Sequence, residues 1–305
     1  MLRNLVSERM MDDLIEDFED SGVEISRTEI EAKEIMKRIV HHDQDTGGVY
    51  VEVTGAQGSG KTSVMLGFLE QILKFYPNEK IFWSSSYKSP LQFLKLGEEN
   101  YDKIKFLVKE GSGVYFVNRK TGKKIDLNVT YFTDFDDLYE KSEYQYCNAV
   151  FFGDRMEWMN FIEFLRSKYD WTHVFIDEFG EVAPSDQSGK LWSRIKQFSE
   201  VVKEVRKCDV NLFTNSQSVT DVDYRVRKKI MVKIFLPGAH SDRKARVSQK
   251  AIDNLERDPE KGNYGYLEYS GKFGRLRFTK IYRPPRGLSI EAQVEPKKED
   301  EDNGK

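Results

Sequence analysis

The sequence predicts an α/β fold in which a mainly parallel sheet lies between helices. Two stretches carry most of this prediction, because each is an apolar, strand-like run that ends in residues typical of a nucleotide site. Residues 49–63 lead through a glycine-rich turn into a helical run, and residues 173–178 end in two carboxylates. Further strand-like runs alternate with amphipathic helical runs, as expected for a parallel sheet covered by helices.

Residues 49–63 match the phosphate-binding loop pattern G-x-x-x-x-G-K-[ST]. An apolar, β-branched run precedes the glycines, and a helical run follows them. The glycines let the backbone curl around a phosphate, and the loop amides and the start of the helix would donate hydrogen bonds to it. The residues predicted to bind the nucleotide are Gly55, Ala56, Gln57, Gly58, Ser59, Gly60, Lys61, Thr62 and Ser63.

Two of these residues have a more specific predicted role. Lys61 would bridge the β- and γ-phosphates of ATP, so it would serve both binding and catalysis. Thr62 would place its hydroxyl on Mg²⁺, a hard cation that prefers oxygen ligands.

The segment after the first helix contains several predicted elements. Residues 81–86 form a second strand, and the mixed stretch 91–108 is predicted to be helical. Residues 114–129 contain two strand-like runs joined by a turn, which predicts a β-hairpin inserted between core elements. Its tip is either a solvated surface or a projection that contacts a polymer or a partner, and it carries Arg119, Lys120, Lys123 and Lys124.

Asp177 and Glu178 end the apolar run 173–176, which is a Walker B pattern. Asp177 would hold Mg²⁺, and Glu178 would orient and polarise the attacking water as a general base or its equivalent. More than a hundred residues separate Lys61 from Asp177, which leaves room for an additional core strand, and residues 149–152 supply one. Together, the paired carboxylates and the additional strand favour an ATPase over a GTPase or a small kinase.

The next strand predicted, residues 210–214, follows an amphipathic helix at 191–205 and ends in polar residues. Gln217 lies in that polar segment and can both donate and accept hydrogen bonds, so it would sense the γ-phosphate through water. The short basic helix at 221–229 carries Arg225 and Arg227. These arginines could act as fingers toward a neighbouring subunit, contact a phosphate backbone, or remain surface charges.

The chain closes with a strand at 231–236, a polar helix at 241–257 and a β-hairpin within 264–282. Its predicted organisation is an N-terminal helical segment over 1–44, a main domain over 45–290 and a disordered acidic tail over 291–305.

Composition narrows the class of protein further. The chain has 305 residues with 20 Phe and 15 Tyr, enough for a sizeable core, and its net charge of −3 argues against coating nucleic acid by bulk charge. Cys147 and Cys208 lie far apart in apolar surroundings, which indicates a reducing compartment rather than a disulfide framework. No apolar run approaches the roughly 20 residues of a membrane span. A cytoplasmic location is therefore expected, in the host cell if the protein is viral.

This set of motifs resembles the FtsK/HerA-type pumping ATPases, and within them the Zot-like and viral DNA-packaging branch. The resemblance rests on residues 55–63, 174–180 and 214–227, where a polar strand end with Gln217 precedes a D-x-x-x-R-x-R segment, and it covers about residues 45–285. It implies a RecA-like P-loop core, commonly a hexameric ring, with ATP bound between subunits. Zot-like morphogenesis proteins usually carry a membrane span, which this sequence lacks, so the packaging or translocating type is favoured.

The function expected from the sequence is Mg²⁺-dependent ATP hydrolysis coupled to DNA translocation or packaging, in a viral or plasmid context. The alternative is a nucleotide-controlled assembly factor that acts on protein partners. A P-loop phosphotransferase is less favoured, because neither an acceptor pocket nor an arginine-rich lid is evident.

Overall fold

The structure, a computed structural model, describes most of the chain from Gly47 onward. The N-terminal helices expected within residues 1–40 and the acidic tail beyond residue 295 lie outside the described residues, apart from short pieces. The described residues are 23–25, 39, 47–87, 89–96, 98–185, 188–240, 248–255, 257–258, 262–269, 272–278, 282 and 289–295.

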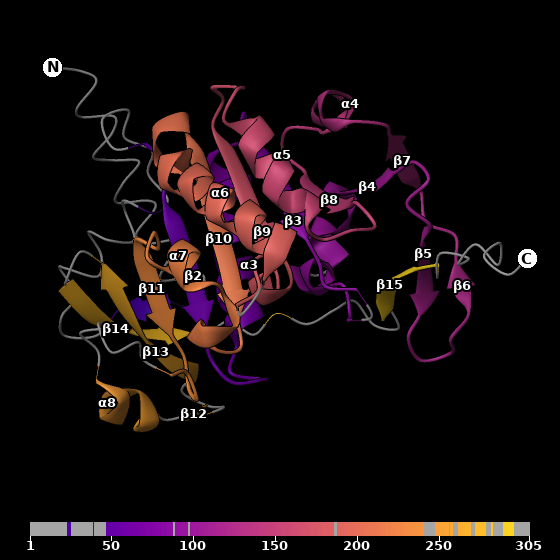
Figure 1. The fold of residues 1–305 in the computed structure, drawn as a ribbon. Coiled ribbons are helices and arrows are strands. Elements are labelled where there is room, and N and C mark those ends of the chain that lie inside the picture. The colour runs from indigo at the N-terminus through magenta and orange to yellow at the C-terminus, as the bar shows by residue number, and fades with distance from the viewer. Residues whose placement is uncertain are drawn as a thin grey trace, which may run out of the picture.

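A 12-stranded sheet forms the centre of the molecule (Figure 1). The larger part of the sheet is parallel and has the order β11-β2-β10-β9-β3-β8-β4-β7. Strands β13, β14 and β1 extend the sheet beyond β11 with antiparallel pairing. The parallel strands are β2 (Tyr50–Thr54), β3 (Lys80–Ser84), β4 (Ile104–Lys109), β7 (Val129–Phe132), β8 (Cys147–Phe151), β9 (Thr172–Ile176), β10 (Val210–Ser216) and β11 (Val232–Phe235). The antiparallel ones are β1 (Val23–Ile25), β12 (Arg257–Asp258), β13 (Gly262–Tyr269) and β14 (Lys272–Phe278).

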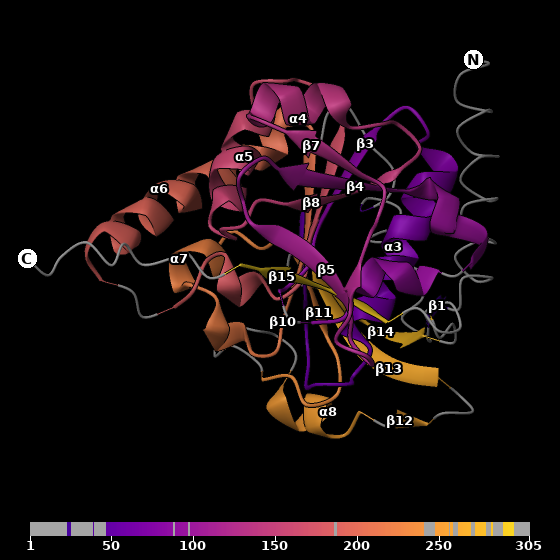
Figure 2. The same cartoon turned by 90° about the vertical axis from the view of Figure 1, so that its right-hand side faces the viewer.

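Helices cover both faces of this sheet. Figure 2 shows α3 (Lys61–Phe75) on one side, with α5 (Glu157–Leu165) and α6 (Gly189–Val205) on the other. Along β2, Val51 and Val53 belong to the core cluster that contains the apolar face of α3, whereas Tyr50 belongs to the cluster that contains α5 and α6. The predicted fold class, a mainly parallel sheet between helices, is confirmed. Shorter helices are α4 (Phe135–Lys141), α7 (Tyr224–Arg227) and α8 (Gln249–Asp253).

The strand order places β10 between β2 and β9. The register is level there, because Thr214 lies opposite Glu52 on one side and Ile176 on the other. The strand predicted at 149–152 is confirmed as β8, which lies between β3 and β4 in the sheet.

The stretch 91–108 is not the helix expected from its mixed pattern. It forms two 3₁₀ helices, Gln92–Leu96 and Glu98–Lys103, followed by strand β4. Phe106, Leu107 and Val108 are all buried, because both faces of a parallel strand are covered. Such a continuous apolar run has no period-2 signal that would distinguish it from a helix.

A second, three-stranded sheet has the order β15-β5-β6. The predicted hairpin is confirmed in β5 (Val114–Asn118) and β6 (Lys124–Ile125), but Val129 already belongs to β7 of the large sheet. Strand β15 (Ile290–Val294) pairs with β5, so the predicted disordered tail is wrong over its first residues. Ile290 and Ala292 are buried on one side of β15, a short alternation that the acidic composition around it conceals.

The closing hairpin is confirmed as β13 and β14, and Val23–Ile25 pairs with β14 as strand β1 in the segment expected to be helical. Within the described residues, no helix combines the length and the apolar character needed to cross a bilayer.

Glu52 is a carboxylate in the middle of the parallel sheet. It is 1% exposed and accepts a hydrogen bond from Ser216 Oγ at 3.0 Å. Burial raises the pKa of Glu52 from 4.5 to about 7, and the Ser216 hydrogen bond and the charges of Arg227 and Lys233 oppose this rise only in part.

A carboxyl with a raised pKa binds its proton more tightly in the folded chain than in the unfolded chain. The free energy of unfolding should therefore fall as pH rises from 4.5 through about 7, by on the order of 3 kcal/mol for Glu52. We expect Glu52→Gln to be more stable than the wild type near pH 8 and to lose that advantage near pH 5. Denaturant unfolding at both pH values measures the difference, with the exposed Glu110→Gln as control. A stability difference that does not change with pH would contradict this prediction.

Candidate functional site

The phosphate-binding loop joins β2 to α3 and depends on two glycines. Gly60, directly before the helix, has φ of 102°, a left-handed conformation that side chains other than glycine rarely adopt. A Cβ atom at Gly55 would lie 2.8 Å from Leu236 Cβ and 2.5 Å from Ser59 Oγ, so only glycine fits there. The predicted strand, glycine-rich loop and helix are all present.

Lys61 lies inside this loop. Its Nζ donates to the carbonyl oxygens of Gly55 at 2.9 Å and Ala56 at 3.2 Å. Burial lowers the pKa of Lys61, and the nearby carboxylates of Glu178 and Asp177 partly restore it. The ammonium group therefore faces both the loop and the carboxylates, where it could bind the phosphates of a nucleotide.

Some backbone amides of the loop donate to carbonyls within the protein, and others remain available to a ligand. The Ala56 amide donates to Pro237 O at 3.1 Å and the Ser59 amide to Ala56 O at 3.1 Å, so these two stabilise the loop itself. The Gln57 and Gly58 amides have no backbone acceptor in the described part of the chain. Together with the first-turn amides of α3, which no intrahelical carbonyl can satisfy, they form the donor set for an anion.

The two carboxylates follow β9, and one buried amide binds the carboxylate of Asp177 and the backbone of Glu178. Asn215, at the end of β10, is fully buried. Its Nδ2 donates to Asp177 Oδ1 at 2.6 Å and lies 2.8 Å from Met65 Sδ of α3, and its Oδ1 accepts from the Glu178 amide at 2.9 Å. Glu178 itself has φ of 54°, so the chain turns sharply where the carboxylates are presented.

Burial destabilises the charged form of both carboxylates, and the positive charges nearby offset this only in part. Burial raises the pKa of Asp177, and the Asn215 hydrogen bond, with the charges of Arg155 and Lys61, opposes this. Burial also raises the pKa of Glu178, as does the charge of Asp177. A divalent cation between the two carboxylates and a nucleotide would stabilise the charged forms. One carboxylate, the Thr62 hydroxyl and the phosphates of a nucleotide are a donor set that suits Mg²⁺.

Gln217 is exposed beside Glu178, and its side-chain hydrogen bond to the carboxylate lowers the pKa of Glu178 in part. Its role as a sensor of the γ-phosphate stays a prediction. The arginines are engaged within their own chain. Arg225 forms a two-point ion pair with Asp223, at 2.9 Å and 2.8 Å, and Arg227 lies near Asp223 and Glu52. Action of either arginine on a neighbouring subunit stays a prediction.

Sequence analysis missed several polar residues around the carboxylates. Arg155, which follows β8, is 8% exposed, donates to the Asp177 carbonyl and pairs with Glu181 at 2.9 Å. Glu181 also accepts from Ser86 Oγ at 2.8 Å, which ties in the end of β3. Lys95 is near enough for the charge of Asp177 to raise its pKa against burial. Their only signal is that each polar residue follows or lies near an apolar strand; no local motif marks them.

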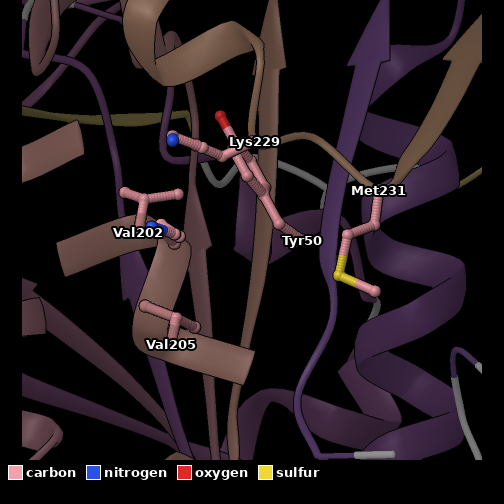
Figure 3. Close-up of a pocket in the computed structure, with 6 residues that line it drawn as sticks. Tyr50, Val202, Val205, Lys229 and Met231 are labelled. Atoms are coloured by element: carbon pink, nitrogen blue, oxygen red, sulfur yellow. The ribbon is translucent and has the colours of Figure 1, made fainter. Parts of the chain in front are cut away.

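The nucleotide site is distinct from a cavity at the other end of the sheet. A cavity of about 170 Å³ lies between the end of α6 and the start of β2 (Figure 3). Tyr50 is the first residue of β2, whereas the phosphate loop follows its last residue, so the two sites are at opposite ends. Glu200 pairs with Lys203 at 3.7 Å and with Lys229 at 4.0 Å beside it. The lining residues are Tyr50, Val202, Lys203, Val205, Lys229 and Met231.

No protein-family model matches this chain, and no curated protein matches its sequence. Solved structures do match. The genome-packaging NTPase B204 from Sulfolobus turreted icosahedral virus 2, in complex with ATP-gammaS, aligns over 80% of this chain and 99% of its own, at 16% identity and TM-score 0.45. The N-terminal domain of zonular occludens toxin from Neisseria meningitidis aligns over 78% and 100%, at 13% identity and TM-score 0.35. The pCW3 conjugation coupling protein TcpA, with ATPgS, aligns over 80% and 68%, at 11% identity and TM-score 0.45.

These neighbours include a viral packaging NTPase and a Zot domain. All three TM-scores are below 0.5, so the fold assignment depends on this chain's own strand order. With the phosphate loop after β2, the carboxylates after β9 and β10 between them, the chain has the RecA-like P-loop NTPase core that the sequence predicts.

We expect Asn215→Ala to lower nucleotide hydrolysis at this candidate site on the order of 10²-fold, because it frees the Asp177 carboxylate and the backbone turn at Glu178 from a fixed geometry. It should also destabilise the fold by about 1–3 kcal/mol, since two buried groups lose their partner. Asn148→Ala is the matched control: Asn148 is equally buried, on β8, and donates to Ile81 O and Glu143 O at 2.9 Å each. Rates are compared at a temperature where both variants are folded. An equal loss of hydrolysis in both would show that stability alone accounts for the effect.

Proposed function

We propose that this protein is a Mg²⁺-dependent ATPase. The observation that carries the proposal is the single amide of Asn215, which bridges Asp177 and the Glu178 backbone beside the loop that holds Lys61. Two separately predicted motifs, more than a hundred residues apart in the sequence, are thereby brought to one edge of the sheet.

Each residue has one step to perform in this proposal. Lys61 would exchange the loop carbonyls for the β- and γ-phosphates, and Thr62 and Asp177 would hold Mg²⁺. Glu178 would accept a proton from the attacking water or orient it, and its raised pKa favours proton acceptance near neutral pH. Gln217, on the Glu178 carboxylate, would report the presence of the γ-phosphate to the end of β10.

We further propose that hydrolysis moves DNA, in a viral or plasmid context. The sequence resemblance to packaging ATPases over residues 45–285 supports DNA as the polymer that is moved. It also supports an oligomeric ring with ATP between subunits. The proposed ATPase domain spans 45–290, and the location that fits this role is the cytoplasm of the host cell. Stimulation of hydrolysis by DNA is the property that distinguishes this function from an assembly factor acting on proteins.

Lys61→Ala should abolish ATP binding or weaken it greatly, because the loop loses its only ammonium group on the phosphates. Lys74→Ala removes the same charge from the exposed end of the same helix and should bind ATP as the wild type does. Titration with a fluorescent ATP analogue measures both affinities. Wild-type affinity in a folded Lys61→Ala protein would remove the basis of the nucleotide site.

Glu178→Gln should keep ATP bound but slow its turnover by roughly 10²-fold or more, the range expected when a general base is lost. Glu110→Gln, an exposed glutamate after β4, is the control for the loss of one carboxylate. Phosphate release is measured with saturating ATP, together with the affinity for ATP. Turnover of Glu178→Gln within a few-fold of the wild type would assign the base to another residue.

A further inference from the structure

Two exposed aromatic side chains lie on the surface formed by α6 and α7, and cations accompany each. Trp192 is 44% exposed and Tyr224 is 54% exposed. The guanidinium carbon of Arg225 lies 4.5 Å from the Trp192 ring centre and Lys196 Nζ lies 5.5 Å from it, while Lys228 Nζ lies 4.2 Å from the Tyr224 ring centre. We call Trp192, Lys196, Tyr224, Arg225 and Lys228 the aromatic–basic face.

Two of the three cations of this face, Lys196 and Lys228, are not neutralised by a neighbouring carboxylate. Among the described residues, neither Lys196 nor Lys228 has a carboxylate within 4.0 Å, and Arg225 pairs only with Asp223. The chain as a whole has a net charge of −3, so this positive surface is a local concentration of cations. Tryptophan, tyrosine and arginine are common at protein–protein interfaces, so the two lysines carry the distinction: lysines are depleted at such interfaces and are attracted by phosphates, which favours a polyanion.

The face is mounted on the two strand ends that carry the candidate catalytic groups. The segment that follows Glu178 and the segment that follows Gln217 are joined by backbone hydrogen bonds, from Asp223 N to Ala183 O at 2.9 Å and from Ser185 N to Asp221 O at 3.0 Å. Helix α6 continues from the first segment and α7 from the second. A ligand bound to the face would therefore contact helices that are connected directly to the ends of β9 and β10.

We propose that the aromatic–basic face binds single-stranded nucleic acid, with bases stacked on Trp192 and Tyr224 and phosphates on Lys196 and Lys228. Aromatic rings bind bases by stacking, and only an unpaired strand offers a free base face, whereas a duplex offers chiefly its phosphates. This inference rests on the proposed function only for the class of polymer, a nucleic acid. Binding to the face itself requires no ATP hydrolysis.

The experiment measures binding of a labelled single-stranded oligothymidine and of a duplex of equal length to the full chain, by fluorescence anisotropy without nucleotide. The single strand should bind more tightly. Trp192→Ala and Tyr224→Ala should each weaken it by about 5- to 150-fold, the range for one lost stack, and Trp192→Phe should retain most of the affinity. Lys196→Ala and Lys228→Ala should each reduce the slope of log K against log salt by about 0.7.

Tyr169→Ala and the pair Lys120→Ala and Lys123→Ala are matched controls. Tyr169 is 77% exposed in the loop before β9, and the two lysines lie at the exposed tip of the β5–β6 hairpin. Unchanged affinity in folded Trp192→Ala and Tyr224→Ala proteins would overturn the proposal. So would tighter binding of the duplex, or a loss confined to the hairpin lysines. A change in oligomeric mass with the aromatic variants, without loss of oligothymidine binding, would assign the face to contact between copies instead.

The outcome is separable from that of the proposed ATPase. Lys61→Ala should bind the oligothymidine as the wild type does, because the phosphate loop takes no part in the face. Normal ATP hydrolysis with no stacking overturns this inference alone. Stacking in a protein that does not hydrolyse ATP supports this inference while removing the proposed function.

Discussion

The fixed position of the Asn215 amide is the constraint on which the candidate site depends. A fully buried amide must use both its donor and its acceptor, and here they meet Asp177 on one side and the Glu178 backbone on the other. That geometry exists because β2, β10 and β9 are neighbours in level register, so their carboxyl ends reach the same edge of the sheet. A slip of β10 by one residue would turn Asn215 to the opposite face and release the Asp177 carboxylate and the Glu178 backbone.

Arg155 and Glu181 extend this constraint to the strands on the other side of β9. Arg155 comes from the end of β8 and Ser86 from the end of β3, and Glu181 links the two. The buried guanidinium also holds the Asp177 carbonyl, so the turn that presents the carboxylates is fixed from both directions. The polar edge of the sheet is therefore one connected network rather than a set of independent side chains, and such networks stabilise geometry more than single pairs do.

The parts of this site that lie within a short stretch of sequence could be predicted from the sequence. Gly55 to Ser63 and the pair Asp177 and Glu178 are each read from a short motif with its flanking strand, and the structure brings them together as expected. Asn215 and Arg155 could not be assigned in the same way, because their importance depends on which strand lies next to which. Strand β4 was missed because a doubly buried strand has no alternation, and β15 because its buried positions lie in an acidic segment.

The pairing of β15 with β5 has a consequence for how the chain is made. The β5–β6 hairpin leaves the ribosome long before residues 290–294 do, and a two-stranded hairpin is at best marginally stable by itself in water. Until residues 290–294 have been synthesised, one edge of β5 presents unpaired amides and carbonyls to any other extended chain. Strand β15 therefore pairs with β5 late in synthesis. Before that, the basic hairpin of each nascent polypeptide is open to pairing with a neighbouring chain on the same messenger RNA.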